Sequence, residues 1–413
     1  MRAAGLDRPL LATWLALGLI GLATLYSAGE TDVPGAAFGM WERQLMWLLI
    51  GGVAAVLVFR ISPRLLEWAT PAIYVTAILL LIVTLVAGTG AGTAAGTRSW
   101  IAIGDVRIGQ PAEFAKLATL LLLARHLGAR RDPPETLREL IPACAIAGVP
   151  CLLVALQPDL GSAIVFLGIV FACLFWVGTN LWLLLLLASP VISLMLAFST
   201  PIWGGWIVVL TVLLIWLRPF VLEGIVVWLA NVLMGVMALQ LWQGLAPYQQ
   251  NRLLSFLNPE SDPRATGWHI IQSKVAIGSG GLLGKGFTEG TQKRLAFLPA
   301  QHTDFIYSVV GEEWGFVGVV VTIVLFGVLL ATLVRIARRA TDPFSCVLVF
   351  GIAGMVFTHI IENIGMTVGV MPITGIPLPF FSYGGSFMLT LCVGLGMVLR
   401  VAWEGRRAGY AEA

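Results

Sequence analysis

The segment "AQHTDFIYSVVGEEWG", residues 300–315, opens a long apolar run that extends to residue 334. Asp304 stands at the head of this run, and Glu312 and Glu313 lie about two helical turns further in. Ionisable side chains at the head of a membrane span are costly, so they are seldom present without a function. The segment therefore predicts a membrane helix whose entrance carries chemistry.

The composition of the whole chain indicates a membrane protein. Of 413 residues, 58% are apolar and 11% are charged, and the mean hydropathy is +0.91. A soluble chain has about 25% charged residues. We therefore expect a single all-α, polytopic membrane domain over residues 1–413. The apolar runs of bilayer-crossing length are residues 10–28, 44–59, 68–87, 111–127, 140–156, 160–178, 181–198, 202–217, 220–242, 305–334, 344–364 and 387–403.

Basic residues indicate which side of the membrane each loop faces. If the N-terminus is cytoplasmic, most arginines lie at cytoplasmic helix ends, and the short outer loops hold only Arg43, Arg98 and Arg107. Lys and Arg favour the cytoplasmic side, so we expect both termini in the cytoplasm. The loops of unusual sequence then all face outward. They are residues 88–109, 157–159, 243–304 and 365–386.

The loop of residues 243–304 is too long to lack structure in a compact protein without a functional reason. Within "GWHIIQSKVAIGSGGLLGKG", Trp268, Ile271 and Val275 form one apolar helix face, and the opposite face is polar and includes Ser273. This pattern predicts a short helix at the membrane surface.

The glycine-rich stretch "GSGGLLGKG" ends beside Lys285. It lacks the glycine and the hydroxyl residue that a nucleotide-binding phosphate loop requires, so that function is excluded. Two interpretations stay open: a turn that cradles an anion next to Lys285, and a flexible turn at the membrane surface.

Three polar residues in "GQPAEFAKLATLLLLARH" are spaced three apart, so Gln110, Glu113 and Lys116 share one helix face. They form either an internal ion pair that holds helices together or the lining of a cavity. Asp159, in "LQPDLGSAIVF", has the position of a helix N-cap. The segment 363–386 combines prolines and glycines at membrane depth, where irregular backbone must be surrounded by protein or a wet cavity.

Together these motifs resemble the SEDS family (shape, elongation, division, sporulation). The resemblance rests on "RSWIAIG", "GQPAEFAKL", "QPDLGSAI", "NRLLSFLNPESDP", "GWHIIQSKVAIGSGGLLGKG", "GTQKRLAFLPAQHTDFIYSVVGEEWG" and "NIGMTVGVMPITGIPLPFFSYGGS", in family order. It implies a core of about ten helices, so residues 200–242 are expected to insert two additional apolar segments. Residues 243–304 then form a large extracytoplasmic loop leading to Asp304. The "GKG…GTQ…HTDFI" run favours the elongation branch of the family.

The resemblance implies a peptidoglycan glycosyltransferase that polymerises lipid II at the outer face of the bacterial cytoplasmic membrane, during elongation and shape maintenance. Transfer from undecaprenyl pyrophosphate would invert the sugar carbon. Asp304 is the expected general base, and Glu113 and Lys116 are expected to be important for activity. The expected substrate-binding residues are Arg98, Trp100, Lys285, Gln292, His302, Thr303 and Ser382.

The sequence shows no zinc-type cluster, because its four histidines are scattered and its five cysteines lie in apolar segments. The sequence indicates no particular cofactor, and we expect no metal held by the protein alone. A divalent cation such as Mg²⁺ would bind together with the substrate pyrophosphate. The expected partners are a class B penicillin-binding protein with transpeptidase activity, other elongation-machinery membrane proteins and membrane lipids. Nucleic acid is not expected, since the net charge is only +3.

Other interpretations are open at this stage. Asp304 could serve only as a helix cap. The buried Glu113 and Lys116 would also suit a flippase for the lipid-linked precursor, although alternating access needs gates on both faces. A scaffold that recruits cell-wall enzymes leaves the intramembrane charges without a task, and a division-specific family member is the nearest enzymatic alternative.

Overall fold

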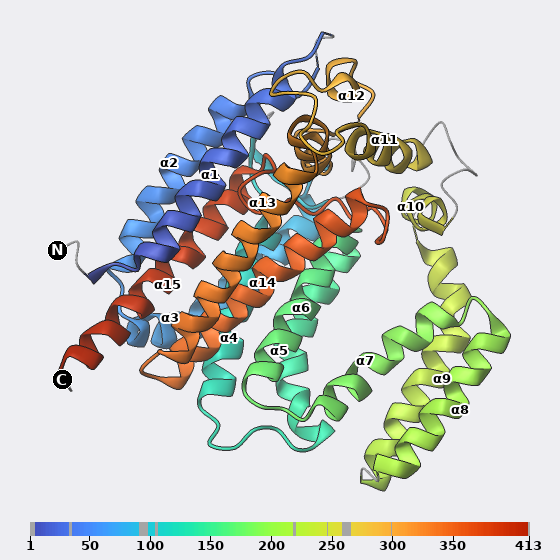
Figure 1. Ribbon diagram of the computed structural model, residues 1–413. Coiled ribbons are helices and arrows are strands. Elements are labelled where there is room, and N and C mark those ends of the chain that lie inside the picture. The colour runs from blue at the N-terminus through green and yellow to red at the C-terminus, as the bar shows by residue number, and fades with distance from the viewer. Residues whose placement is uncertain are drawn as a thin grey trace.

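The computed structural model describes residues 5–32, 35–90, 98–103, 106–217, 220–245, 247–257, 266–298 and 300–411 (Figure 1). Its regular structure in these ranges is helical apart from one small hairpin, in which β1 (Ile101–Ile103) pairs antiparallel with β2 (Val106–Gly109). The helices are α1 (Arg8–Gly29), α2 (Met40–Phe59), α3 (Pro63–Ala87), α4 (Pro111–Gly128), α5 (Leu137–Leu156), α6 (Leu160–Trp176), α7 (Leu181–Leu196), α8 (Thr200–Leu217), α9 (Val221–Gly244), α10 (Pro247–Leu257), α11 (Thr266–Ser279), α12 (Thr291–Arg294), α13 (Ile306–Arg338), α14 (Pro343–Thr367) and α15 (Gly385–Ala411).

The expected all-α, polytopic membrane fold is confirmed. Each of the apolar runs expected from the sequence corresponds to one helix. Of the described helices, nine are long and apolar enough to cross a membrane, and α6 and α7 are shorter apolar helices. Helix α4 is less apolar because it carries Glu113, Lys116 and Arg125.

The centre of the bundle is built from α4, α6, α13, α14 and α15. Helix α14 packs on α13, α6 and α4, and α15 packs along α2. In α14 and α15, 67% and 78% of the apolar window is buried, so these helices form the interior rather than the lipid-facing surface. Small residues allow close helix approach: a Cβ on Gly51 would lie 2.7 Å from the sulfur of Cys392 on α15.

Helices α7, α8 and α9 form a separate group at the side of the bundle (Figure 1). Their own apolar cluster contains Leu186, Leu210 and Val227. Asn231 donates to the hydroxyl of Ser189, which supports the group from within. Only 6% of the apolar window of α8 and 17% of that of α9 is buried. These two helices lie where the two additional apolar segments were expected, and they present mostly apolar side chains outward.

The glycine-rich stretch before α12 packs against a kink in α13. Gly315 has a left-handed backbone (φ 65°) inside that helix, and the N–H of Phe316 donates to the carbonyl of Gly281 (2.9 Å). The N–H of Lys285 donates to the carbonyl of Glu312 (3.0 Å). A Cβ on Gly284 would lie 2.0 Å from the carbonyl oxygen of Glu313. The glycines therefore permit a close backbone approach, and the N–H groups of Lys285 and Gly286 are already used in bonds to α13.

The short helix expected in the large loop is confirmed as α11. Val275 is 44% exposed, whereas Ser273 is fully buried. The hydroxyl of Ser273 lies 2.7 Å from that of Ser308 and donates to the carbonyl of Thr367 (2.6 Å). A small hydroxyl side chain lets α11 approach α13 and α14 closely and satisfies polar groups there. This contact decides which face is buried.

Candidate functional site

Asp304 lies in the turn that leads into α13. The helix has Phe305 as its N-cap residue, and no side chain caps its N-terminus. The residue as a whole is half-buried. A Cβ on Gly375 would lie 3.5 Å from Oδ2 of Asp304 and 3.8 Å from Nη1 of Arg252, so the carboxylate and the guanidinium flank the same glycine. Capping does not account for this aspartate.

The surroundings of Asp304 favour proton uptake. Burial raises the pKa of its carboxyl group above the ordinary value of an aspartate; the positive charge of Arg252 and a hydrogen bond from Thr303 act in the opposite direction. A raised pKa gives the carboxylate a greater affinity for a proton, which suits a general base.

The backbone of this turn is fixed by the segment between α14 and α15. The hydroxyl of Ser382 donates to the carbonyl of Thr303 (2.6 Å), and the N–H of Tyr383 donates to the carbonyl of His302 (2.9 Å). The amide of Asn363 donates to the carbonyl of Asp304 (3.0 Å). Irregular backbone at this depth is thus surrounded by protein, as the sequence requires.

Glu113 and Lys116 form the second candidate centre, in the first turns of α4. The ammonium of Lys116 lies 2.7 Å from Oε1 of Glu113, and the two residues are 1% and 3% exposed. The pair lies within one helix, so it cannot itself join two helices. The contact that does so is from Lys116 Nζ to Nε2 of His359 on α14 (3.3 Å).

One carboxylate oxygen of this centre is available. Oε2 of Glu113 is buried and has no hydrogen-bond partner in the described part of the chain. Buried polar atoms are nearly always paired, so an unpaired one requires an explanation. This oxygen favours the interpretation in which the charges line a functional cavity.

The two centres share one stretch of backbone. Nδ1 of His359 lies 3.1 Å from the carbonyl oxygen of Pro377. One residue earlier, the carbonyl of Ile376 accepts from Asn363 (2.8 Å), the same amide that contacts Asp304. The segment around Gly375 therefore touches the Asp304 turn and is linked to Lys116 through His359.

The expected substrate-binding residues lie in separate parts of the structure. His302, Thr303 and Ser382 lie with Asp304, and the ring of His302 is 6.4 Å from that of Tyr383. Arg98 is exposed next to the small hairpin, and the backbone of Trp100 pairs with that of Thr89.

Lys285 and Gln292 instead belong to a cluster around Glu312. The carboxylate of Glu312 accepts from the ammonium of Lys285 (2.7 Å) and from the backbone N–H of Gln292 (2.9 Å). Next to it, Glu313 pairs with the buried ammonium of Lys293 (2.6 Å). The two glutamates at the head of α13 thus hold the loop of residues 280–298 against that helix.

Sequence reasoning missed Arg252, His359 and Asn363. Arg252 is part of the quoted motif "NRLLSFLNPESDP", and Asn363 begins "NIGM". Both were therefore visible as motif residues without an assigned role. His359 stands four residues before Asn363, and a lone histidine in an apolar helix gives no signal of its partner.

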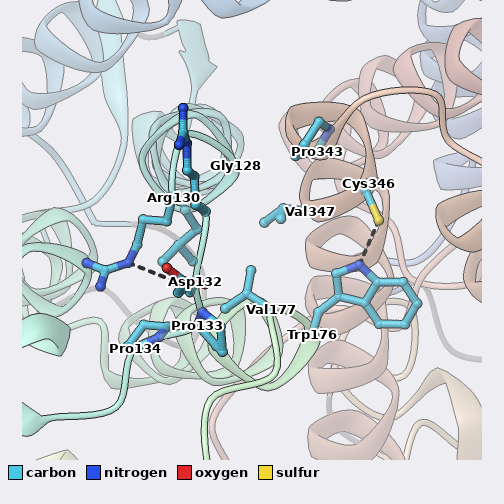
Figure 2. Close-up of a pocket in the computed structure, with 12 residues that line it drawn as sticks. Gly128, Arg130, Asp132, Pro133, Pro134, Trp176, Val177, Pro343, Cys346 and Val347 are labelled. Carbon is cyan, nitrogen blue, oxygen red and sulfur yellow. Dashed lines mark hydrogen bonds between the residues drawn. The ribbon is translucent and has the colours of Figure 1, made fainter.

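The pocket in Figure 2 is at the other end of the bundle. Its lining includes Gly128 at the end of α4, Trp176 at the end of α6 and Pro343 at the start of α14. Glu113 and His359 are at the opposite ends of α4 and α14. None of the candidate site residues lines this pocket, so we assign it no part in the chemistry. Among the described residues, no group of three or more His, Cys, Asp or Glu side chains could hold a metal.

The fold and site define a polytopic membrane protein with an acidic residue at the entrance of a central helix and a buried ion pair behind it. The model of the FtsW, RodA and SpoVE family, described as a cell cycle protein, matches residues 6–220 and 203–407. The chain belongs to this family, which is the SEDS family that the sequence motifs indicate.

Individual relatives support the same family assignment. The peptidoglycan glycosyltransferase MrdB of Escherichia coli K12 is 35% identical, with 96% of this chain and 93% of that protein covered. A probable glycosyltransferase FtsW of Trichlorobacter lovleyi is 34% identical, with coverage of 97% and 94%. In a solved structure of a peptidoglycan synthase complex that coordinates polymerization and crosslinking, one chain matches with a TM-score of 0.71 and 30% identity, covering 98% of this chain and 99% of that chain.

Proposed function

We propose that this protein is a peptidoglycan glycosyltransferase that polymerises lipid II into glycan strands. The observation that carries the proposal is the carboxylate of Asp304, which is not used as a helix cap and lies beside Arg252. Family membership and relatives of that name support the same activity. We propose the elongation branch, on the "GKG…GTQ…HTDFI" run.

In the proposed reaction, a sugar hydroxyl of one substrate attacks the anomeric carbon of the other. The new C–O bond forms as the bond from that carbon to the pyrophosphate oxygen breaks, which inverts the carbon. The hydroxyl proton passes to the carboxylate of Asp304, and undecaprenyl pyrophosphate leaves with the electron pair of the broken bond. A positioned general base contributes about 10²- to 10⁴-fold to such a reaction.

Positive charge is needed where the pyrophosphate departs. Arg252 lies next to Asp304, and the ammonium of Lys116 is held by Glu113. We propose that these two cations stabilise the negative charge that develops on the leaving group. A Mg²⁺ ion bound by the substrate pyrophosphate would supply further positive charge.

The site is proposed to face outward, with both termini in the cytoplasm. This orientation follows from the basic residues at the ends of the helices. Lipid II carries its sugars outside, so the acceptor and donor would reach Asp304 from that side. The protein would be a multi-pass component of the bacterial cytoplasmic membrane.

We propose a class B penicillin-binding protein as the principal partner, alongside elongation-machinery membrane proteins. The similar chain in a complex that coordinates polymerization and crosslinking supports such an arrangement. A transpeptidase next to the site would crosslink strands as they emerge.

The direct test is reconstitution of the purified protein with lipid II, alone and with a class B penicillin-binding protein. Glycan strands resolved by gel electrophoresis are the expected product. Movement of labelled lipid II from one leaflet of the vesicle membrane to the other, without any strand formation, would instead identify a flippase and reject the proposed activity.

A further inference from the structure

His359 is buried between the two candidate centres without a role in the chemistry described so far. It is 1% exposed, and its ring stacks on that of Phe387 with 4.5 Å between the centroids. Each ring nitrogen has one polar neighbour: Nε2 faces the ammonium of Lys116 (3.3 Å), and Nδ1 faces the carbonyl oxygen of Pro377 (3.1 Å). The two contacts lead in different directions.

The neighbours determine where the ring proton must be. An ammonium group has three N–H donors and no acceptor, whereas a carbonyl oxygen only accepts. Nε2 must therefore accept from Lys116, and Nδ1 must carry the hydrogen that is donated to Pro377. One neutral tautomer satisfies both contacts, and a ring protonated on Nε2 would direct an N–H at the ammonium.

The Pro377 carbonyl belongs to the backbone stretch that contacts the Asp304 turn. Gly375 lies against the Asp304 carboxylate, and Ile376 shares the amide of Asn363 with Asp304. His359 and Asn363 are four residues apart on α14, so they lie on one face of that helix. The ammonium of Lys116 and the segment beside Asp304 are consequently held by adjacent turns of the same helix.

We propose that His359 is a positioning residue: in its neutral Nδ1–H form it fixes the Lys116 ammonium relative to the backbone that flanks Asp304. This inference rests on the proposed function, in which Lys116 and Asp304 act on the leaving group and the acceptor of one reaction. A misplacement of about 1 Å can cost on the order of 10²-fold in rate. His359 can therefore affect the rate through the position of Lys116, without touching substrate.

Glutamine and leucine separate positioning from space filling. Glutamine offers a carbonyl to Lys116 and an N–H to Pro377, as the histidine tautomer does. Leucine fills a similar volume but leaves both groups unpaired. The control is His126→Leu, a histidine near the far end of α4.

The experiment measures kcat and KM for lipid II polymerisation by the purified parent, His359→Gln, His359→Leu and His126→Leu. We expect His359→Gln and the control to stay near the parental kcat. His359→Leu should lose about 10- to 100-fold in kcat, with KM changing little. Parental kcat in His359→Leu, or an equal loss in His359→Gln, would overturn the proposal.

A second measurement does not depend on activity. Solid-state NMR of the parent with ¹⁵N-labelled histidine rings, assigned by the resonances missing in His359→Gln, reports the tautomer directly. A pyrrole-type Nδ1 and a pyridine-type Nε2 are expected. Protonation on Nε2 overturns the positioning role. Failure of the parent to polymerise lipid II would reject the proposed function, while the NMR result still decides the state of His359.

Discussion

Glu113 and Lys116 bury opposite charges side by side in α4, with 2.7 Å between the paired atoms. Removing one partner of a buried pair leaves the other uncompensated, which typically costs about 3–5 kcal/mol. We expect Glu113→Leu and Lys116→Met each to lower the thermal unfolding midpoint markedly, and the double variant to recover part of the loss.

The double variant also separates function from structure. If the pair acts in catalysis, the folded double variant should make no glycan strands. A double variant less stable than the sum of the two single losses would disprove the pairing. Parental polymerisation by the double variant would leave the pair with only a structural role.

Arg252 sets the acid limit of activity if Asp304 is the base. Burial raises the pKa of Asp304, and the positive charge of Arg252 lowers it. Arg252→Gln removes the lowering effect, so the pKa of Asp304 should rise further and the ionised base should be lost at a higher pH. We expect the acidic limb of the kcat/KM profile to shift upward.

The matched control is Arg294→Gln, an exposed arginine on α12 paired with Asp32. Its acidic limb should coincide with that of the parent. If the acidic limb of the kcat/KM profile of Arg252→Gln stays in place or moves to lower pH, Asp304 is not the titrating base.

At the scale of single residues, the sequence predicted local relations and missed distant ones. The spacing of Glu113 and Lys116 placed both on one helix face, and the pair is present. Asp159 was expected as an N-cap, and its carboxylate accepts from the N–H of Ser162 (3.0 Å). His359 lies 243 positions from Lys116, and no local periodicity can report such a contact.

At the scale of elements, the junction between α13 and the glycine-rich stretch is the most constrained. Gly284 has φ +82°, and an added Cβ would overlap the carbonyl of Glu313. Gly284→Ala combines a left-handed backbone, about 1–2 kcal/mol, with overpacking, about 1–3 kcal/mol. We expect a lower unfolding midpoint and reduced polymerisation.

Gly278→Ala is the control for this substitution. Gly278 lies in α11, and a Cβ there would have no neighbour within 4 Å. Its stability and activity should match those of the parent. Equal behaviour of the two alanine variants would mean that the loop does not pack closely on α13.

The sequence predicted that these elements exist, but not which of their faces would be buried. Apolar length alone placed the helices, because a membrane requires it. The buried face of α11 could not be read from apolar spacing, since Ser273 is buried by hydrogen bonds to α13 and α14. The kink at Gly315 likewise depends on the loop that packs on it.

At the scale of the whole molecule, the orientation in the membrane determines whether the site can meet lipid II sugars. Leu283, in the glycine-rich stretch, is 80% exposed, and Arg131, at the other end of the bundle, is exposed as well. In a background without the five native cysteines, Leu283→Cys should react with a membrane-impermeant thiol reagent on intact cells, and Arg131→Cys should not. The reverse pattern would refute the orientation and the enzymatic proposal with it.

The overall architecture was predictable to the extent that composition determines it. The helices and the core followed from hydropathy, whereas the lateral position of α7, α8 and α9 follows from their own packing around Leu210 and Asn231. That α8 and α9 are an insertion into a ten-helix core stays a prediction.

The central claim is that Asp304 acts as the base of a glycan polymerase, and Asp304→Asn tests it most directly. No side chain caps α13, so the substitution should leave the unfolding midpoint near that of the parent. The purified variant, assayed with lipid II, should polymerise about 10²- to 10⁴-fold more slowly. Glycan strands formed at the parental rate would contradict the account.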